Sequence, residues 1–229
     1  MGKPLLTLVE VCKSPSPGRE EVFRHLLGDH CQLQSSGALD HLSDQALLSQ
    51  KPLNKADVLY ANLPSDGRSV RVSKTFVIQA LRKYIGELTP DDTAIRLLCC
   101  TGEFPEFSSS PILMPSTIIR KVLPQQLEKG ATLGVFVPCE GQEEEAIEQW
   151  GGEGYRVITM VLPEDAPPDW VTASAMSMCR ESPDKLFFDS MSYTTQFQAN
   201  VANICPIPSI LATTAVAEHI KALLVDAAV

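Results

Sequence analysis

Several features that would identify a function class are missing from this 229-residue sequence. No apolar run approaches the roughly 18 to 20 residues that cross a bilayer, so we expect no membrane association. The start of the chain carries Glu10 inside its only apolar stretch, which predicts a first strand and not a signal peptide. No basic stripe interrupts the net charge of −9, and a negative surface repels nucleic-acid phosphates. We therefore expect no nucleic-acid partner.

Cofactor and metal motifs are also missing. The seven cysteines include no CxxC pair and no disulfide-scaffold spacing, which favours reduced thiols and a cytoplasmic location. The four histidines lack metal-ligand spacing, so no metal site is predicted. There is no GxGxxG motif, Walker loop or GxSxG elbow, which leaves nucleotide-cofactor and serine-hydrolase functions without a motif.

What the chain does contain is an alternation of short β-prone runs and helical patterns, with 44% hydrophobic residues to form a core. The predicted strands are 5–11, 58–63, 69–72, 94–101, 132–137, 156–161, 186–189 and 207–211. The predicted helices are 19–27, 74–86, 117–128, 143–150, 171–180, 195–203 and 214–225. This alternation is typical of parallel sheets with helical crossovers, and its restart near residue 130 indicates two such layers.

Local signals sharpen some boundaries. Ser73 and Ser116 are predicted helix N-caps, and Pro124 should interrupt or bend the helix that follows Ser116. The segment from Pro64 to Gly67 predicts a hairpin turn, because its Asp-Gly pair favours one. The Ser- and Pro-rich stretch 103–115 predicts a long connection, a feature that is usually functional or mobile in a compact domain.

Candidate site residues lie where strands end, because open α/β sheets bind ligands beyond the carboxyl ends of their strands. Four such junctions, 14–19, 99–103, 139–142 and 190–195, carry polar or thiol side chains. At the second, Cys100 precedes Thr101 and Gly102, a combination suited to a nucleophile or base beside an anion cradle. Side chains alternate along a strand, so we expect Cys99 to pack in the core. The alternative is that both cysteines are small buried apolar residues.

Two of these junctions resemble a known family. The segment from Cys100 to Pro105 and that from Phe188 to Thr194 are similar to the two signature loops of the AroM family, a branch of the aspartate/glutamate racemase superfamily. The resemblance covers most of the chain. It implies two pseudo-symmetric Rossmann-like domains with parallel sheets, helices on both faces and a cleft between them. It also implies domains of 1–120 with 206–229 and of 121–205, and no cofactor.

The resemblance further implies proton transfer at the carbon next to a carboxylate, with one cysteine from each loop. Here the first loop keeps Cys100, but the second has Ser190 where the family usually carries cysteine. A serine hydroxyl is far too weak an acid to replace a thiolate without activation. We therefore expect a cofactor-independent isomerase or lyase in which Cys100 is the acid/base thiol and Ser190 hydrogen-bonds a small carboxylate. The expected substrate contacts also include Thr101, Gly102, Ser192, Tyr193 and Thr194.

Four further residues are candidates for the same site. Cys139 follows a predicted strand and could supply a second thiol. Arg19 resembles an arginine that the family often carries after its first strand, and Ser14 lies in the same junction. Alternatively, Arg19 is a solvated charge that pairs with Glu20 or Glu21. Glu10 is either an acid of the site or an exposed strand terminus.

A different function class stays open. The loss of the second cysteine could mark a non-catalytic protein that binds or senses small carboxylates on the same fold. A catalyst should carry a Cys100 thiol that iodoacetamide alkylates quickly, whereas a receptor needs none. Paired domains of this type commonly associate, which leaves a homodimer open.

Overall fold

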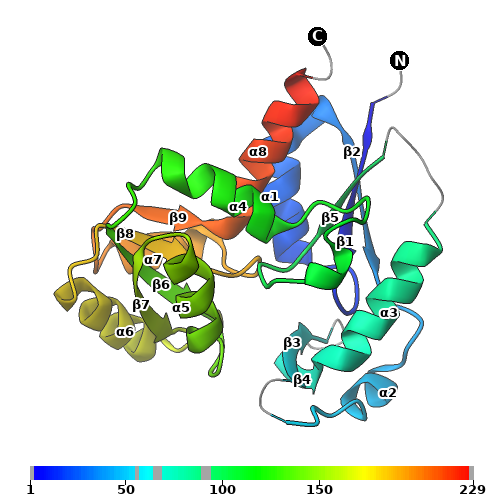
Figure 1. Ribbon diagram of the computed structural model, residues 1–229, viewed down its shortest axis with the longest axis horizontal. Coiled ribbons are helices and arrows are strands. Elements are labelled where there is room, and N and C mark those ends of the chain that lie inside the picture. The colour runs from blue at the N-terminus through cyan, green and yellow to red at the C-terminus, as the bar shows by residue number, and fades with distance from the viewer. Residues whose placement is uncertain (1–2, 55–56, 64–68, 89–93, 227–229) are drawn as a thin grey trace. The chain divides into compact units, whose positions relative to one another are not determined.

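The computed structural model describes residues 3–54, 57–63, 69–88 and 94–226. Internal contacts divide the chain into two compact units, Met1–Pro115 with Leu224–Val229, and Ser116–Leu223. Each unit holds its own parallel sheet flanked by helices (Figure 1), which confirms the predicted α/β class. Within the described ranges, no helix is both long enough and apolar enough to span a bilayer.

The sheet of the first unit has three parallel strands in the order β2-β1-β5. The central strand β1 (Leu5–Glu10) pairs with β2 (Gln32–Gly37) and with β5 (Ala94–Leu98). A central parallel strand is covered on both faces, so its apolar run is continuous instead of alternating. Leu6, Leu8 and Val9 are accordingly fully buried.

Helix α1 (Pro17–Leu27) crosses from β1 towards β2 and packs through Phe23 and Leu27. It begins slightly before the predicted Arg19, because proline suits the first position of a helix, where no N–H is needed. It ends at Gly28, whose φ of 52° lies in the region that favours glycine. The short 3₁₀ helix η1 (Gly28–His30) then leads into β2.

A β-hairpin and the helix after it complete the first unit. β3 (Val58–Asn62) and β4 (Ser69–Ser73) pair antiparallel, and α3 (Lys74–Gly86) follows directly. Ser73 caps α3 as predicted, because its Oγ accepts a hydrogen bond of 3.1 Å from the Phe76 N–H. The buried Asp57 accepts from the Ser73 hydroxyl at 2.8 Å and from the Thr75 N–H at 2.7 Å. The predicted turn 64–67 lies outside the described residues.

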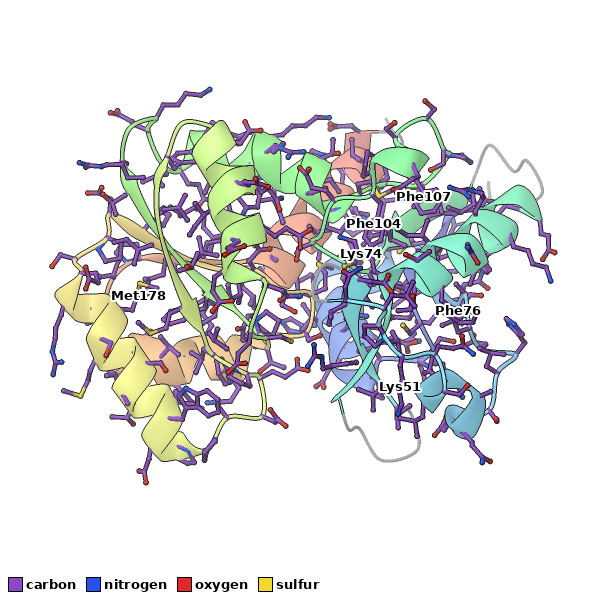
Figure 2. All side chains as sticks on the ribbon, turned by 60° about the horizontal axis from the view of Figure 1, so that its bottom comes forward. Lys51, Lys74, Phe76, Phe104, Phe107 and Met178 are labelled. Atoms are coloured by element: carbon purple, nitrogen blue, oxygen red, sulfur yellow. The ribbon has the colours of Figure 1, made fainter. Side chains whose placement is uncertain are left out.

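The connection after β5 is packed against the first unit. It contains the 3₁₀ helix η3 (Pro105–Phe107), and Leu113 forms a parallel bridge with Leu97. The rings of Phe104 and Phe107 are buried and stacked with centroids 6.2 Å apart. The Lys74 ammonium lies 6.0 Å from the Phe104 centroid (Figure 2), which is a cation–π distance. Aromatic burial therefore fixes a segment whose composition predicted only a long connection.

The second unit is built on four parallel strands in the order β7-β6-β8-β9. Their bounds are β6 (Thr132–Val137), β7 (Arg156–Val161), β8 (Lys185–Phe188) and β9 (Ser209–Leu211). The helices are α4 (Pro115–Val122), the 3₁₀ helix η4 (Leu123–Gln125), α5 (Glu143–Gly152), α6 (Pro168–Arg180), α7 (Thr195–Ala202) and α8 (Ala212–Asp226). All four predicted strands of this region are present.

Aromatic rings fill much of the core of the second unit. Trp150 of α5 meets Phe187 of β8 edge-to-face at 5.3 Å, and Phe136 of β6 stacks on Phe188 at 5.2 Å. On β6, a Cβ added to Gly134 would lie 2.7 Å from the Met178 sulfur and 2.9 Å from Pro183 Cγ, so these side chains would have to shift to admit a larger residue (Figure 2 labels Met178). Close packing of α6 against the sheet thus depends on that glycine.

Some sequence-based boundaries are wrong. Ser116 does not cap a helix, because α4 already begins at Pro115, a residue favoured at helix starts. Pro124 does end the α-helix as expected, since α4 stops at Val122 and continues as η4. Neither β2 nor the short α2 (Asp44–Leu48) was predicted, and for β2 the reason is that its sequence QLQSSG is polar and gives no apolar alternation.

The predicted first domain included residues 206–229. In the structure, β9 pairs in parallel with β8 and so belongs to the second sheet. Only the end of α8, from Leu224, groups with the first unit. This assignment depends on strand pairing, which the sequence around Ser209 does not encode by itself.

Candidate functional site

The end of β5 presents two adjacent cysteines in different environments. Cys99 is 4% exposed, and its N–H donates to the Val9 carbonyl at 2.8 Å, which extends the pairing with β1. Burial raises the pKa of the Cys99 thiol well above its ordinary value. Cys99 therefore packs in the core, as predicted. Cys100 is half-buried at the edge of the apolar cluster of the first unit, followed by the buried Thr101 and the half-buried Gly102.

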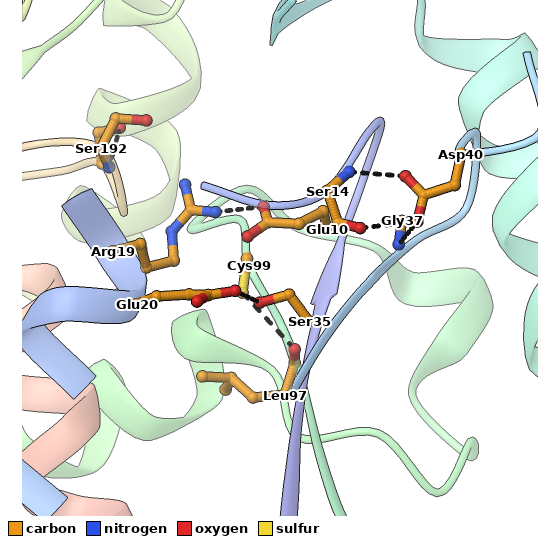
Figure 3. Close-up of polar contacts among 11 residues, drawn as sticks. Glu10, Ser14, Arg19, Glu20, Ser35, Gly37, Asp40, Leu97, Cys99 and Ser192 are labelled. Atoms are coloured by element: carbon orange, nitrogen blue, oxygen red, sulfur yellow. Dashed lines mark hydrogen bonds and ion pairs between the residues drawn. The ribbon is translucent and has the colours of Figure 1, made fainter. Parts of the chain in front are cut away.

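An ion pair closes the carboxyl end of β1. The Arg19 guanidinium, in the first turn of α1, donates to Glu10 Oε2, and each side chain is 7% exposed (Figure 3). The two alternatives, an exposed strand terminus for Glu10 and a solvated Arg19 paired with Glu20 or Glu21, are therefore wrong. Chain reversal over the loop 11–16 brings the two charges together, and Glu20 instead contacts Ser35.

Burial and pairing act on Glu10 in opposite directions. Burial raises the pKa of the Glu10 carboxyl above its ordinary value, and the Arg19 charge lowers it by less. Among the described residues, Glu10 Oε1 is buried and has no hydrogen-bond partner. The strand end thus holds a carboxyl group with one oxygen committed to Arg19 and one uncommitted oxygen.

Ser14 is anchored by a carboxylate that the sequence analysis missed. The Ser14 N–H and hydroxyl donate to the two Asp40 oxygens at 2.7 Å each (Figure 3). Asp40 also accepts from the Gly37 N–H at 2.7 Å. A Cβ on Gly37 would lie 2.7 Å from the Cys12 carbonyl oxygen, so glycine lets the end of β2 approach this loop. Gly-x-x-Asp after a polar strand was the available signal.

Cys12 is a further residue that sequence reasoning missed. It follows β1, is buried, and lies close enough to Cys100 and Glu10 for both to raise the pKa of its thiol, after the larger effect of burial. Because β1 and β5 are adjacent and parallel, Cys12 and Cys100 occupy the same edge of the first sheet. The sequence around Cys12 gave no signal, since a single cysteine after a strand matches no known motif.

The second signature loop follows β8 in the second unit. The buried Asp189 accepts from the Trp150 indole N–H at 2.8 Å, which fixes the start of the loop. The half-buried Ser190 accepts from the Ser192 N–H at 3.1 Å through its hydroxyl oxygen. The Ser190 hydroxyl proton is not used in that bond and can be donated elsewhere.

Two residues of this loop that were predicted to contact substrate form hydrogen bonds within the protein. Tyr193 is 1% exposed, and its hydroxyl donates to the Leu162 carbonyl at 2.5 Å. Burial raises the pKa of Tyr193 well above its ordinary value. The Thr194 hydroxyl oxygen accepts from the Phe197 N–H at 3.1 Å and so caps α7. Both side chains hold the loop in place, and their substrate contacts stay a prediction.

Cys139 follows β6, the strand that pairs with β8. Because the two strands are parallel neighbours, the half-buried Cys139 and Ser190 both lie beyond the same edge of the second sheet. Cys139 is also near enough to Tyr193 to raise the pKa of its hydroxyl. The second unit thus has a thiol at the edge where Ser190 lies.

The described part of the chain contains no group of three or more His, Cys, Asp or Glu side chains that could hold a metal ion. The strand-end residues instead offer thiols, hydroxyls, a guanidinium and a carboxyl. Such groups can transfer protons and bind carboxylates.

The chain was compared with protein-family models, curated sequences and solved structures. The family model described as AroM protein matches residues 6–224. No curated protein sequence matches the chain. Among solved structures, a glutamate racemase from Bacillus anthracis is similar, with a TM-score of 0.60 and 11% identity over 98% of this chain and 82% of the other.

Two other enzymes share the fold. A maleate cis-trans isomerase from Nocardia farcinica has a TM-score of 0.57 and 13% identity over 97% of this chain and 92% of the other. The Gly74Cys mutant of an arylmalonate decarboxylase has a TM-score of 0.54 and 13% identity over 99% of this chain and 95% of the other. At these identities the likeness establishes the fold.

Proposed function

The chain belongs to the AroM family, and from that premise we propose that it is a cofactor-independent isomerase or lyase acting at the carbon next to a carboxylate of a small acid. The observation that carries the proposal is a thiol, Cys100, half-buried at the carboxyl end of β5 beside its fully packed neighbour Cys99. Ligands of open α/β sheets bind at such strand ends.

The names of the similar structures support the substrate class. The three enzymes are named after arylmalonate, glutamate and maleate, and each of these compounds is a carboxylic acid. The three are a decarboxylase, a racemase and an isomerase. Protonation or deprotonation of a carbon beside a carboxylate would suit a chain of this fold that carries one thiol in its first signature loop.

Each proposed residue has a chemical role. In the proposal, Cys100 transfers the proton, and hydrogen-bond donors stabilise the negative charge that develops on the carboxylate oxygens. Thr101, Gly102 and the Ser190 hydroxyl would supply those donors, with Ser192, Tyr193 and Thr194 shaping the second loop. Ser190 lacks the acidity of a thiol, so the proposal assigns it to binding and not to proton transfer. Cys139 is the candidate for a second proton-transfer group.

Isotope exchange tests the proposal directly. The protein is incubated in D₂O with methylmalonate, glutamate or maleate, and NMR follows deuterium at carbon and any decarboxylation or isomerisation. We expect turnover of at least one acid and a loss of about 100-fold or more in Cys100→Ala, since general acid–base catalysis typically contributes ~10² to 10⁴. Cys179→Ala, another half-buried thiol, is the matched control and should keep activity.

Two outcomes would contradict the assignment. Equal turnover in Cys100→Ala and in the parent would remove Cys100 from the chemistry. Binding of these acids by calorimetry without any exchange or product would instead favour the non-catalytic carboxylate-binding protein. A loss of turnover in Cys139→Ala as large as in Cys100→Ala would identify Cys139 as the second proton-transfer group.

A further inference from the structure

Helix α6 of the second unit has one buried side and one exposed side. The buried side contacts β7 and α7, and the helix lies at the outside of this unit (Figure 1). The exposed side carries two large apolar side chains, Trp170 at 46% and Met176 at 45% exposed. The exposed Ala173 lies between them in the sequence. Apolar groups that gather on one exposed face are typical of an interaction surface.

Charged residues of opposite sign stand at the two ends of this exposed side. Asp169 is in the first turn of α6 and Arg180 is in the last, and both are exposed. Neither forms an ion pair with another described residue. With 3.6 residues per turn, positions 169, 173, 176 and 180 fall within about 60° of the helix surface, and Trp170 flanks them. We call these four residues the α6 seam, because their spacing of four, three and four is that of a helix-packing seam.

We propose that the α6 seam is the contact of a homodimer, in which α6 packs antiparallel against α6 of a second copy. A two-fold axis then places Asp169 opposite Arg180 of the second copy, and Ala173 opposite Met176 of the second copy. Each pair forms twice, and the small alanine leaves room for the flexible methionine. A parallel pairing would instead place Asp169 against Asp169 and Arg180 against Arg180. The charges therefore select the antiparallel arrangement.

A second copy fits this face because the α6 seam is complementary to itself in charge. The contrast is with α5, where Ile147 is also 46% exposed but lies beside the exposed Glu144 and Glu148. Contact of two copies through α5 would bring carboxylates together, and like charges that face one another oppose association. The α6 seam has one acid and one base, so two chains of net charge −9 can meet there without that repulsion.

The size of the contact sets the expected affinity. A helix of 13 residues is about 20 Å long, so two such helices bury less surface than a standard protein interface. We therefore expect a weak dimer with a Kd on the order of 10 µM. No residue of the α6 seam lies in the strand-end loops, so this inference does not depend on the proposed function.

Sedimentation of the full chain over about 1 to 200 µM tests the proposal. We expect the parent to dimerise, and Asp169→Arg and Arg180→Asp each to weaken the dimer about tenfold or more, because each places like charges opposite one another. An equimolar mixture of the two variants should dimerise as the parent does, because two cations then face two anions. Lys83→Glu is the matched control, since it reverses a 74% exposed charge on α3, gives the same net charge as Arg180→Asp and should leave the dimer unchanged.

Hydrogen exchange of the parent gives a second test that needs no variant. Dilution from about 200 to 1 µM should speed exchange in peptides from α6 and leave peptides from α5 unchanged. Three sedimentation results would overturn the proposal: a parent that stays monomeric, a dimer that both single variants keep, or a mixture that fails to restore it. Faster exchange on dilution in α5 instead of α6 would do the same.

Discussion

The two units use different interactions to hold the loops that follow their central strands. In the first unit, β1 ends at the buried pair of Glu10 and Arg19, and Asp40 anchors the following loop. In the second unit, the loop after β8 is held by Trp150 bonded to Asp189 and by the buried ring of Tyr193. Both sheets are parallel, so the loops after neighbouring strands begin at the same edge of each sheet. The comparison shows that one architecture can be fixed by charge in one unit and by aromatic burial in the other.

Removal of the Arg19 charge should destabilise the first unit more than any other change considered below. In Arg19→Met the Glu10 carboxyl stays buried without its partner, so we expect the first unit to lose about 3 to 5 kcal/mol in urea unfolding. Arg24→Met is the matched control on the same helix, because the Arg24 side chain is 59% exposed and its bridge to Glu20 should contribute below about 1 kcal/mol. Equal losses in the two variants would mean that charge does not fix the first unit.

Removal of an indole N–H should weaken the second arrangement by less. Trp150→Phe keeps an aromatic ring in the core but removes the 2.8 Å bond to buried Asp189, so we expect a loss of about 2 kcal/mol in the second unit. Near-ultraviolet circular dichroism with urea unfolding would measure it. Trp170→Phe, at a position 46% exposed, should change stability by less than about 0.5 kcal/mol. A neutral Trp150→Phe would show that packing alone holds the loop.

Crowding at β6 tests how tightly the second core is packed. In Gly134→Ala the new methyl would meet the Met178 sulfur at 2.7 Å and Pro183 Cγ at 2.9 Å, so we expect a loss of about 1 to 3 kcal/mol by thermal unfolding. Gly151→Ala in α5 meets no heavy atom within 4 Å and should stabilise by about 0.5 kcal/mol. A tolerated Gly134→Ala would indicate that α6 moves easily against the sheet.

The pH dependence of the first unit should show two opposite and smaller contributions. The folded pKa of Glu10 is raised from 4.5 by burial, so its contribution to stability is present below that value and is lost as pH rises through the folded pKa. The folded pKa of Asp57 is lowered from 3.8 by hydrogen bonds from Leu53, Thr75 and Ser73, so its contribution is present above that value and is lost on acidification.

Thermal midpoints across the acidic and neutral range separate the two. Glu10→Gln should remove the decline with rising pH, and Asp57→Asn should remove part of the loss at low pH. The same direction of change in both variants would contradict these assignments.

Much of the fold was predictable because its signals are local. The continuous apolar runs of β1 and β6 predict buried parallel strands, and Ser73 predicts a helix cap from its own neighbourhood. The candidate site was predictable in part, since strand ends and signature loops select Cys100 and Ser190. The sequence did not reveal β2, because its polar residues give no apolar alternation and its partner β1 is distant in the chain.

By itself, the sequence determined the α/β class, the family resemblance and the junctions that carry thiols and hydroxyls, because these depend on residues close together in the chain. Only the tertiary structure decided that Glu10 pairs with Arg19 and that Asp40 anchors Ser14. Each of these contacts joins separate elements, and its strength depends on burial. Burial is a property of the packed chain, and no local pattern of residues specifies it.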